Sequence, residues 1–370
     1  MTNLRIPGPT PCPPEVLEAV GRQMINHRGP EFADLLARLT TRLKEVFQTR
    51  HDVLLLTTAG TGAMEAALVN VLSPGDKVLA VSIGVFGERF AQIAETYGAQ
   101  VIRLPFPWGR AADPEEVRKA LQANPGVKAV LVTHNETSTG VTNDLGAIAR
   151  VIHGFDKLII VDAISSLGSI PLPVDEWRLD VVATASQKGW MVPPGLCMLS
   201  MSERAWKAYE TARMPRFYFD AAKAKSYAEK GQTPWTPAIS IAYGLDVALE
   251  MLLAEGLDNV FARHRKVASV ARDGVKGLGL RLFPEEERFA SDTVTAVRVP
   301  EGVEGKRLVG TLREEHGVVV AGGQGELTGK IFRIGHLGYV AEHEVRHLLE
   351  ALETALLKVG YQPSGVAAAP

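Results

Sequence analysis

The sequence predicts an α/β protein, in which a mostly parallel sheet flanked by helices is followed by a smaller α+β domain. Short apolar runs alternate with stretches of helical spacing over the first two thirds of the 370 residues. Runs such as 158–161 are rich in Val, Ile and Leu without polar alternation, as in strands that are buried on both faces. Strand, helix and strand in this order are typical of a parallel sheet with helices on both sides.

The individual elements follow from the same two patterns. Strands are expected at 53–57, 77–81, 101–104, 127–133, 158–162, 181–184 and 195–201. Helices are expected at 61–72, 87–97, 144–153, 239–255 and 259–278. Another helix should start at Asp113, which can cap free N–H groups, because Pro114 fits a first helical turn. We expect an N-terminal segment 1–20 that lines the site, a large domain 21–250 and a small domain 251–370.

Composition and charge exclude several classes of protein. The net charge is −2 and no basic stripe with interleaved aromatic residues occurs, which argues against nucleic-acid binding. The apolar runs are too short to span a membrane, and the first ten residues lack the apolar core of a secretion signal. Cys12 and Cys197 cannot form a disulfide framework, and no spacing of Cys and His indicates a metal site. We therefore expect a cytoplasmic protein without a structural metal.

A candidate phosphate site lies in residues 57–62, between a predicted strand and a predicted helix. The first N–H groups of such a helix attract an anion, and the hydroxyl of Thr61 can add a hydrogen bond. The alternative is a tight turn in which Gly60 has only a backbone role. A dinucleotide site of the dehydrogenase type is disfavoured because Glu65 stands where the third glycine would be, and a kinase-type P-loop is disfavoured because no Gly-Lys-Thr follows.

Asp162 and Lys188 each follow a predicted strand of the same sheet. Ligands of such sheets bind at the carboxyl ends of the strands. Asp162 ends the strand 158–162, although a turn or helix cap would also suit an aspartate there. A lone loop lysine is usually solvated, but small residues flank Lys188 and an apolar segment follows it. A desolvated lysine loses affinity for its proton and can act as a nucleophile or base.

Two further segments are candidates for substrate contacts. Residues 133–140 are dense in hydroxyl and amide groups, as in a loop that lines a polar ligand, but a surface loop is the plainer interpretation. Arg333 lies in an apolar strand-like run and therefore needs a partner. That partner is either a substrate carboxylate or a structural acid.

Taken together, these segments resemble the class V aminotransferases of the fold-type I pyridoxal-phosphate (PLP) enzymes, in particular the alanine–glyoxylate and serine–glyoxylate branch. The matching segments occur in family order: residues 7–10 (PGPT), 27–32 (HRGPEF), 60–67 (GTGAMEAA), 133–140 (THNETSTG), 161–162 (VD), Gly168, 186–189 (SQKG), 193–195 (PPG), 236–240 (TPAIS) and 333–335 (RIG). The resemblance thus covers nearly the whole chain.

The resemblance implies a role for each matching residue. Lys188 would form the Schiff base with PLP, and Asp162 would pair with the protonated ring nitrogen. Gly60, Thr61 and Gln187 would hold the phosphate, with Thr233 reaching it from a second subunit, where Thr236 competes for the role. The remaining implied contacts are Thr137 on the phenolic oxygen, Phe86 and Ile164 on the two ring faces, and Arg333 on the substrate carboxylate near Gly8. Several relatives carry Trp at the position of Phe86.

The implied activity is transfer of an amino group from a small amino acid, alanine or serine, to glyoxylate or pyruvate, by a homodimer with shared sites. Aspartate or a phosphonate-bearing amino acid is the alternative donor. A cysteine desulfurase would need a mobile reactive cysteine, whereas Cys12 precedes the first helix and Cys197 lies in an apolar strand. A non-catalytic PLP-binding protein is disfavoured because both Lys188 and Asp162 are present.

Overall fold

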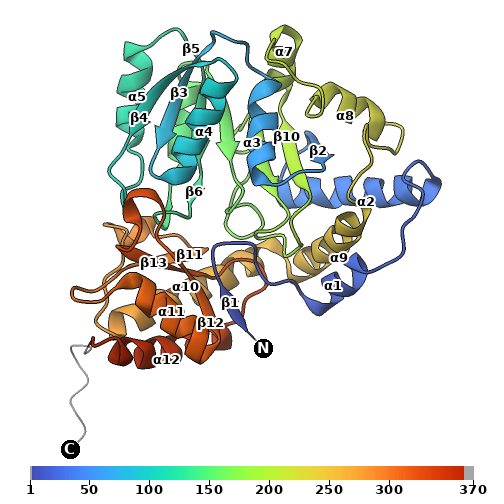
Figure 1. The fold of residues 1–370 in the computed structure, drawn as a ribbon. Helices are drawn as coiled ribbons and strands as arrows, with labels where there is room; N and C mark the ends of the chain where they lie inside the picture. The colour runs from blue at the N-terminus through green and yellow to red at the C-terminus, as the bar shows by residue number, and fades with distance from the viewer. Residues whose placement is uncertain (1, 362–370) are drawn as a thin grey trace, which may run out of the picture.

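The computed structural model describes residues 2–361, which form a large domain and a small domain (Figure 1). In Figure 1 the large domain occupies the upper part, and the small domain, drawn in orange and red, lies below it. The strand nearest the N-terminus joins the small domain, so both ends of the described chain belong to this domain. Residues 362–370 of the predicted small domain lie outside the described residues.

The large domain is built on a seven-stranded sheet in the order β2-β10-β9-β8-β5-β3-β4. Its strands are β2 (Asp52–Leu56), β3 (Lys77–Ser82), β4 (Gln100–Pro105), β5 (Val127–Thr133), β8 (Leu158–Asp162), β9 (Val181–Ala185) and β10 (Cys197–Met201). Only β10 runs antiparallel to its neighbours in this sheet. The predicted mostly parallel sheet is therefore confirmed.

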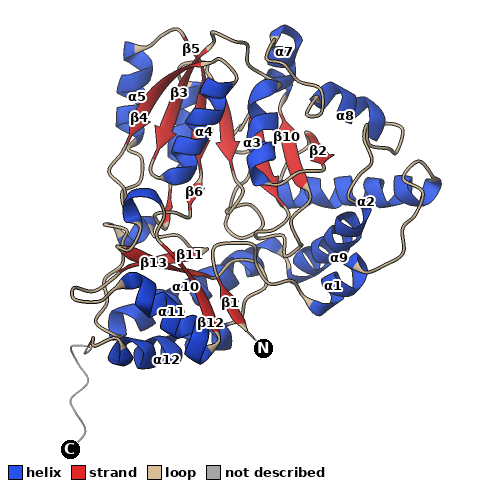
Figure 2. Ribbon diagram, in the orientation of Figure 1, coloured by secondary structure: helices blue, strands red, loops and turns tan. Residues whose placement is uncertain are grey.

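Helices cover both faces of this sheet (Figure 2). One face packs against α1 (Pro14–Val20), α2 (Pro30–Phe47), α5 (Pro114–Ala123), α6 (Leu145–His153) and α9 (Ile239–Glu255). The other packs against α3 (Gly60–Val69), α4 (Val85–Thr96), α7 (Glu203–Thr211) and α8 (Ala221–Ala228). Within β5, Val130 and Val132 join the first core while Ala129 and Leu131 join the second, because side chains alternate between the two faces of a strand.

The small domain has a four-stranded sheet in the order β1-β12-β13-β11. Its strands are β1 (Asn3–Arg5), β11 (Val294–Arg298), β12 (Val318–Gly322) and β13 (Ile331–Gly335). Its helices are α10 (Leu257–Gly277), α11 (Gly305–His316) and α12 (Glu342–Lys358). A third hydrophobic core joins them, with Phe332, Leu308 and Leu352 fully buried. The short ribbon β6 (Asn135–Glu136) and β7 (Val141–Thr142) lies between the two sheets (Figure 2).

Most predicted elements are present with ends shifted by at most three residues, and the strands 127–133 and 158–162 and the helix 239–255 match without a shift. The predicted strand 195–201 begins only at Cys197, because the backbone at Gly195 adopts a φ of 150° in the preceding loop. Helix α9 crosses the predicted boundary at residue 250, so the division into domains remains a prediction. Among residues 2–361, no helix is long and apolar enough to cross a membrane, and no cluster of three His, Cys, Asp or Glu residues could hold a metal.

Candidate active site

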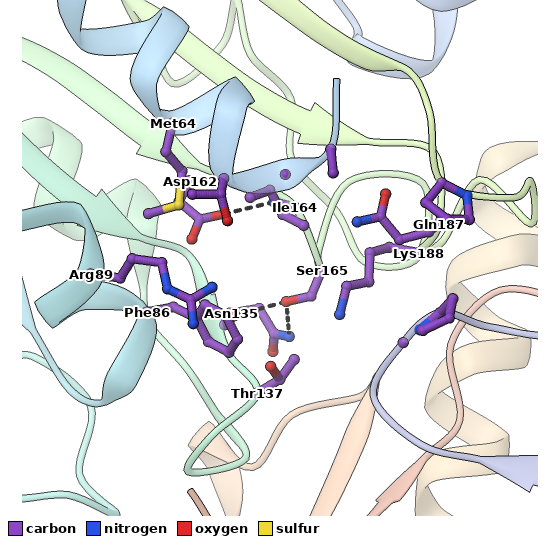
Figure 3. A pocket seen from close by; sticks show the side chains of 16 residues that line it. Met64, Phe86, Arg89, Asn135, Thr137, Asp162, Ile164, Ser165, Gln187 and Lys188 are labelled. Atoms are coloured by element: carbon purple, nitrogen blue, oxygen red, sulfur yellow. Dashed lines mark hydrogen bonds between the residues drawn. The ribbon is translucent and has the colours of Figure 1, made fainter. Parts of the chain in front are cut away.

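A cavity of about 270 Å³ lies at the carboxyl ends of the parallel strands, where the predicted chemistry should be (Figure 3). Nine of the predicted site residues line it: Gly8, Gly60, Thr61, Phe86, Thr137, Asp162, Ile164, Gln187 and Lys188. They come from six separate segments of the chain. The fold therefore brings together residues that the sequence could place only one at a time.

Asp162 ends β8 and is 4% exposed. Its Oδ1 accepts a hydrogen bond from the Ile164 N–H at 2.9 Å, and its Oδ2 accepts one from the Thr133 hydroxyl at 3.4 Å. Burial raises the pKa of Asp162 to about 7, and the Ile164 N–H opposes this shift because it stabilises the charged form. A carboxylate so poorly solvated is well suited to hold a cationic group of a ligand.

Lys188 lies on the loop after β9 and faces Asp162 across the cavity (Figure 3). Burial lowers the pKa of Lys188 to about 8, the charge of Asp162 opposes this shift, and the charges of Arg333 and Arg89 reinforce it. The Nζ atom donates a hydrogen bond to the Pro7 carbonyl at 2.5 Å. A lysine with this pKa is partly unprotonated at neutral pH and can act as a nucleophile.

The N-terminal segment closes the cavity on the Lys188 side. Gly8 has a φ of 138°, and a Cβ atom at this position would lie 2.5 Å from the Lys188 Nζ. A glycine is therefore required here both by the backbone conformation and by the close approach of the lysine.

The start of α3 forms the side of the cavity where a phosphate was predicted. Gly60 and Thr61 open this helix, whose first N–H groups lack partners within the helix. A Cβ atom on Gly60 would lie 2.9 Å from Ile164 Cδ1, so only glycine lets the helix start approach this close. The Gln187 side chain lies nearby; its NH₂ group could donate to an anion, whereas its buried Oε1, which has no hydrogen-bond partner among the described residues, can only accept. This part of the cavity has polar groups available for an anion.

Arg333 lies on β13, next to the cavity rather than in its lining. It is 4% exposed, and its guanidinium donates to the carbonyls of Gly322 and Thr137 at 2.9 and 3.1 Å and to the Gln324 Oε1 at 3.3 Å. Among the described residues no carboxylate forms an ion pair with it. The predicted structural acid is therefore absent there, and burial lowers the pKa of Arg333 to about 10.

Thr233 does not line the cavity of its own chain. Its hydroxyl donates to the Trp235 carbonyl at 2.7 Å, and Arg28 holds the surrounding loop by donating to the Gln232 Oε1 and the Thr233 carbonyl at 2.8 and 2.9 Å. Its predicted phosphate contact, and that of Thr236, concern a second subunit and stay predictions.

The sequence prediction missed several residues that line the cavity: Met64, Arg89, Asn135, Ser165 and Pro194. Arg89 is the only charged residue among these five. It stands one helical turn after Phe86 on α4, and its guanidinium carbon lies 4.8 Å from the centre of the Phe86 ring. A spacing of three residues from a predicted ring-stacking residue was the signal that could have identified it.

A buried lysine facing a buried carboxylate, beside a helix start suited to an anion, defines a site for covalent amine chemistry. Residues 3–341 match the family model described as aminotransferase class V, so the chain belongs to the class V aminotransferases and is an aminotransferase.

Three relatives illustrate the range of the family. The chain is 44% identical to a protein named soluble hydrogenase, small subunit, from Synechococcus sp., over 99% of this chain and 97% of the relative. It is 40% identical to the L-aspartate–glyoxylate aminotransferase of Paracoccus denitrificans, over 98% of this chain and 94% of the relative. The crystal structure of an alanine–glyoxylate aminotransferase from Nostoc sp. superposes with a TM-score of 0.93 at 34% identity, covering 96% of this chain and 95% of the other. These similarities confirm the predicted family and fold.

Proposed function

We propose that this aminotransferase uses PLP to move an amino group from a small amino acid, alanine or serine, to glyoxylate or pyruvate. The observation that carries the proposal is the placement of the buried side chains of Lys188 and Asp162 on opposite sides of one cavity. The name of the Nostoc relative supports the choice of alanine and glyoxylate.

The residues around the cavity fit PLP at each of its polar groups. Lys188 would hold the aldehyde carbon covalently, and Asp162 would hold the ring nitrogen. The start of α3, with Gly60, Thr61 and the NH₂ group of Gln187 as donors, would hold the phosphate. Phe86 and Ile164 would pack on the two ring faces, and Thr137 would reach the phenolic oxygen.

When bound, PLP would supply an electron sink next to the α-carbon of the substrate. Lys188 would take the proton from that carbon and return it, because its pKa of about 8 lets one group serve as base and acid near neutral pH. Asp162 would keep the ring nitrogen of PLP protonated, because few water molecules surround this buried carboxylate to screen its charge.

Arg333 would bind the α-carboxylate that all donors and acceptors share. Its guanidinium is held by two backbone carbonyls and one side-chain amide, and no acid of the described chain forms an ion pair with it. A carboxylate entering from the cavity would provide the missing counter-charge.

We further propose a homodimer in which the loop of Thr233 completes the phosphate site of the other subunit. The support is that this loop is ordered by Arg28 but lies outside the cavity of its own chain. A cytoplasmic location remains a prediction from the sequence.

Aspartate is the second candidate donor, and Arg89 is the observation that favours it. Its guanidinium lines the cavity and forms no hydrogen bond or ion pair among the described residues. It could therefore bind a second carboxylate, and the relative from Paracoccus is named for aspartate.

The experiment is a screen of donors (alanine, serine, aspartate, a phosphonate-bearing amino acid and cysteine) against glyoxylate, pyruvate and 2-oxoglutarate. We expect the highest kcat/KM with alanine or serine and with glyoxylate or pyruvate. A preference for aspartate that disappears in Arg89→Gln would establish the second candidate instead. Sulfide release from cysteine, without transfer of the amino group, would contradict both.

A further inference from the structure

Glu136 is a buried acid next to the cavity that no sequence motif assigned to a role. It lies on β6, is 0% exposed, and does not line the cavity itself. Among the described residues it forms no ion pair with a lysine or arginine. A buried carboxylate without a cation must be stabilised by hydrogen bonds.

Each of the two carboxylate oxygens of Glu136 accepts two hydrogen bonds. The Oε2 atom accepts from the N–H groups of Phe86 and Gly87, at 2.9 and 3.1 Å. The Oε1 atom accepts from the N–H and the hydroxyl of Ser138, at 3.1 and 2.6 Å. Burial raises the pKa of Glu136, while all four of these donors favour the charged form.

The chemistry of these donors requires a carboxylate. The N–H groups of Phe86, Gly87 and Ser138 can donate but cannot accept. A glutamine would fit the space, yet its NH₂ group would face an N–H group whichever way the amide is turned. The ionised side chain is thus the form that satisfies all the surrounding donors.

These bonds join two segments that carry proposed ligand contacts. One segment is the start of α4, which bears Phe86 and Arg89, and the other is the loop of Thr137. Ser138 adds a link, because its hydroxyl accepts the Val85 N–H at 3.0 Å. Gly84 allows the Glu136 side chain to lie against the backbone before α4, since a Cβ atom on residue 84 would lie 2.6 Å from the Glu136 Cγ.

Arg333 is tied to the same unit through one further hydrogen bond, from its guanidinium to the Thr137 carbonyl at 3.1 Å. The charge of Glu136 also acts on Arg333, whose pKa it raises against the larger effect of burial. One carboxylate therefore anchors the segment that would stack on the cofactor ring and the loop that supports the substrate arginine.

We infer that Glu136 is a positioning residue, whose ionised carboxylate fixes Phe86 over the cofactor ring and fixes the Thr137 loop beneath Arg333. The identity of the ligands in this inference rests on the proposed function. The anchoring itself is a property of the protein alone. The alternative is a helix cap that contributes only to stability.

The first test uses the protein without cofactor. Hydrogen exchange followed by mass spectrometry should show that Glu136→Gln speeds exchange of residues 85–88 at least about tenfold, because bonds to a charged acceptor are lost. The matched control is Asp144→Asn, which alters a carboxylate that caps α6 by accepting from the Ala147 N–H at 2.9 Å, away from the cavity. The control should leave exchange in 85–88 unchanged. Unchanged exchange in Glu136→Gln would overturn the anchoring.

The second test separates positioning from stability. Phe86→Trp places a fluorescent ring at the stacking position, and saturating PLP should quench its emission strongly. In the double variant with Glu136→Gln we expect weaker quenching at saturation, a PLP dissociation constant raised about tenfold, and a lower kcat for every donor. Equal quenching at saturation, with only a lowered Tm, would reduce Glu136 to a helix cap.

The two proposals can fail separately. If the unmodified chain does not bind PLP while exchange at 85–88 still depends on Glu136, the proposed cofactor is wrong and the anchoring stands. If Glu136→Gln does not fold, Ser138→Ala removes only the bonds through the hydroxyl and should change exchange and quenching in the same direction, to a smaller extent. No change in either readout with Ser138→Ala would contradict the inference.

Discussion

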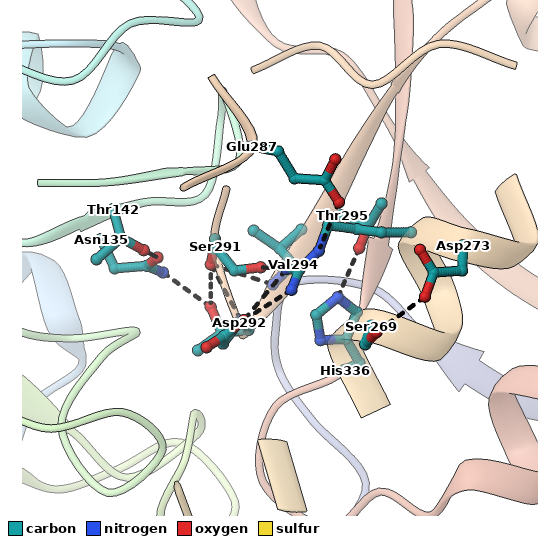
Figure 4. A network of polar contacts seen from close by, with 12 residues as sticks. Asn135, Thr142, Ser269, Asp273, Glu287, Ser291, Asp292, Val294, Thr295 and His336 are labelled. Carbon is teal, nitrogen blue, oxygen red and sulfur yellow. Dashed lines mark hydrogen bonds and ion pairs between the residues drawn. The ribbon is translucent and has the colours of Figure 1, made fainter. Parts of the chain in front are cut away.

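Two buried polar regions of this protein differ in how their groups are satisfied. In the cavity, Lys188 and Asp162 are charged groups that face open space (Figure 3). In the network between the domains, side chains bond to one another: its buried part pairs neutral groups, and carboxylates such as Asp273 and Asp292 lie at its edge (Figure 4). There Asn135 donates to the Thr293 hydroxyl at 2.8 Å, and the Thr295 hydroxyl and His336 Nε2 are 2.8 Å apart.

Charge is the other difference between the two regions. Burial lowers the pKa of His336 to about 3, so this histidine is neutral at physiological pH. Burial shifts the pKa of Asp162 and of Lys188 to about 7 and about 8, into the range where proton transfer is useful. Buried neutral groups that bond to one another stabilise the fold, whereas buried titratable groups around a cavity indicate a ligand-binding site.

The largest effect should come from removing the carboxylate charge of the cavity. Asp162→Asn should retain the covalent bond between Lys188 and PLP but slow removal of the α-proton by about 100- to 1000-fold, because an amide cannot stabilise a protonated ring nitrogen. Exchange of the α-proton in deuterated water measures this step. Exchange near the rate of the unmodified enzyme would refute the role of Asp162.

The next effect concerns the unusual proton affinity of Lys188. The rate at which PLP attaches to the cofactor-free protein should rise with pH, with its midpoint near pH 8 and a plateau above about pH 9, since the pKa of Lys188 falls to about 8 from the usual 10.5. At pH 7 about 10% of such a lysine is unprotonated, roughly 300-fold more than for an ordinary lysine.

Stopped-flow absorbance measures this attachment, and Arg89→Gln tests its cause. Loss of the Arg89 charge should move the plateau to higher pH, because that charge lowers the pKa of Lys188. A rate that keeps rising to pH 10 in the unmodified protein would show that burial does not perturb Lys188.

A smaller loss of activity is expected from Arg333→Lys, which keeps the charge but removes the planar guanidinium and its paired N–H donors. The carboxylate contact should weaken by about 2 kcal/mol, or about 30-fold in kcat/KM, for every donor and acceptor alike. Binding of PLP should survive, because Lys188 and the start of α3 belong to the large domain, whereas Arg333 lies on a strand of the small domain. A defect confined to one donor would mean that Arg333 binds the side chain of that donor and not the α-carboxylate.

The smallest effect on activity should come from the neutral network. Thr295→Val leaves the buried His336 Nε2 without its partner, so the free energy of unfolding should fall by about 1–2 kcal/mol. We expect kcat/KM within about twofold of the unmodified enzyme. Denaturant titration and steady-state kinetics give the two values, and a large kinetic loss would mean that the network, too, is part of the site.

Much of the fold could be predicted from sequence because its signals are local. The strand 158–162 is a continuous apolar run. The helix after Asp113 is capped by the side chain of Asp113 itself, so the signal involves only a few neighbouring residues. Lys188, Asp162 and Gly60 line one cavity because each lies at or after the end of a strand of the same sheet.

The remaining site residues depend on contacts that no local pattern encodes. Glu136 is recognisable only when the start of α4 lies against β6, 50 residues away along the chain. Asn135 bonds to Ser165 within the cavity wall and to Thr293 in the network, which the sequence separates by 158 residues. Long-range packing decides these contacts, so the sequence offered only a loop rich in polar groups.

The most direct test of the account is to locate the lysine that binds the cofactor. The protein loaded with PLP would be reduced with borohydride, digested and mapped by mass spectrometry. We predict a single pyridoxyl label, on the peptide that contains Lys188, and none in Lys188→Ala. A label on any other lysine, or no label after loading, would contradict it.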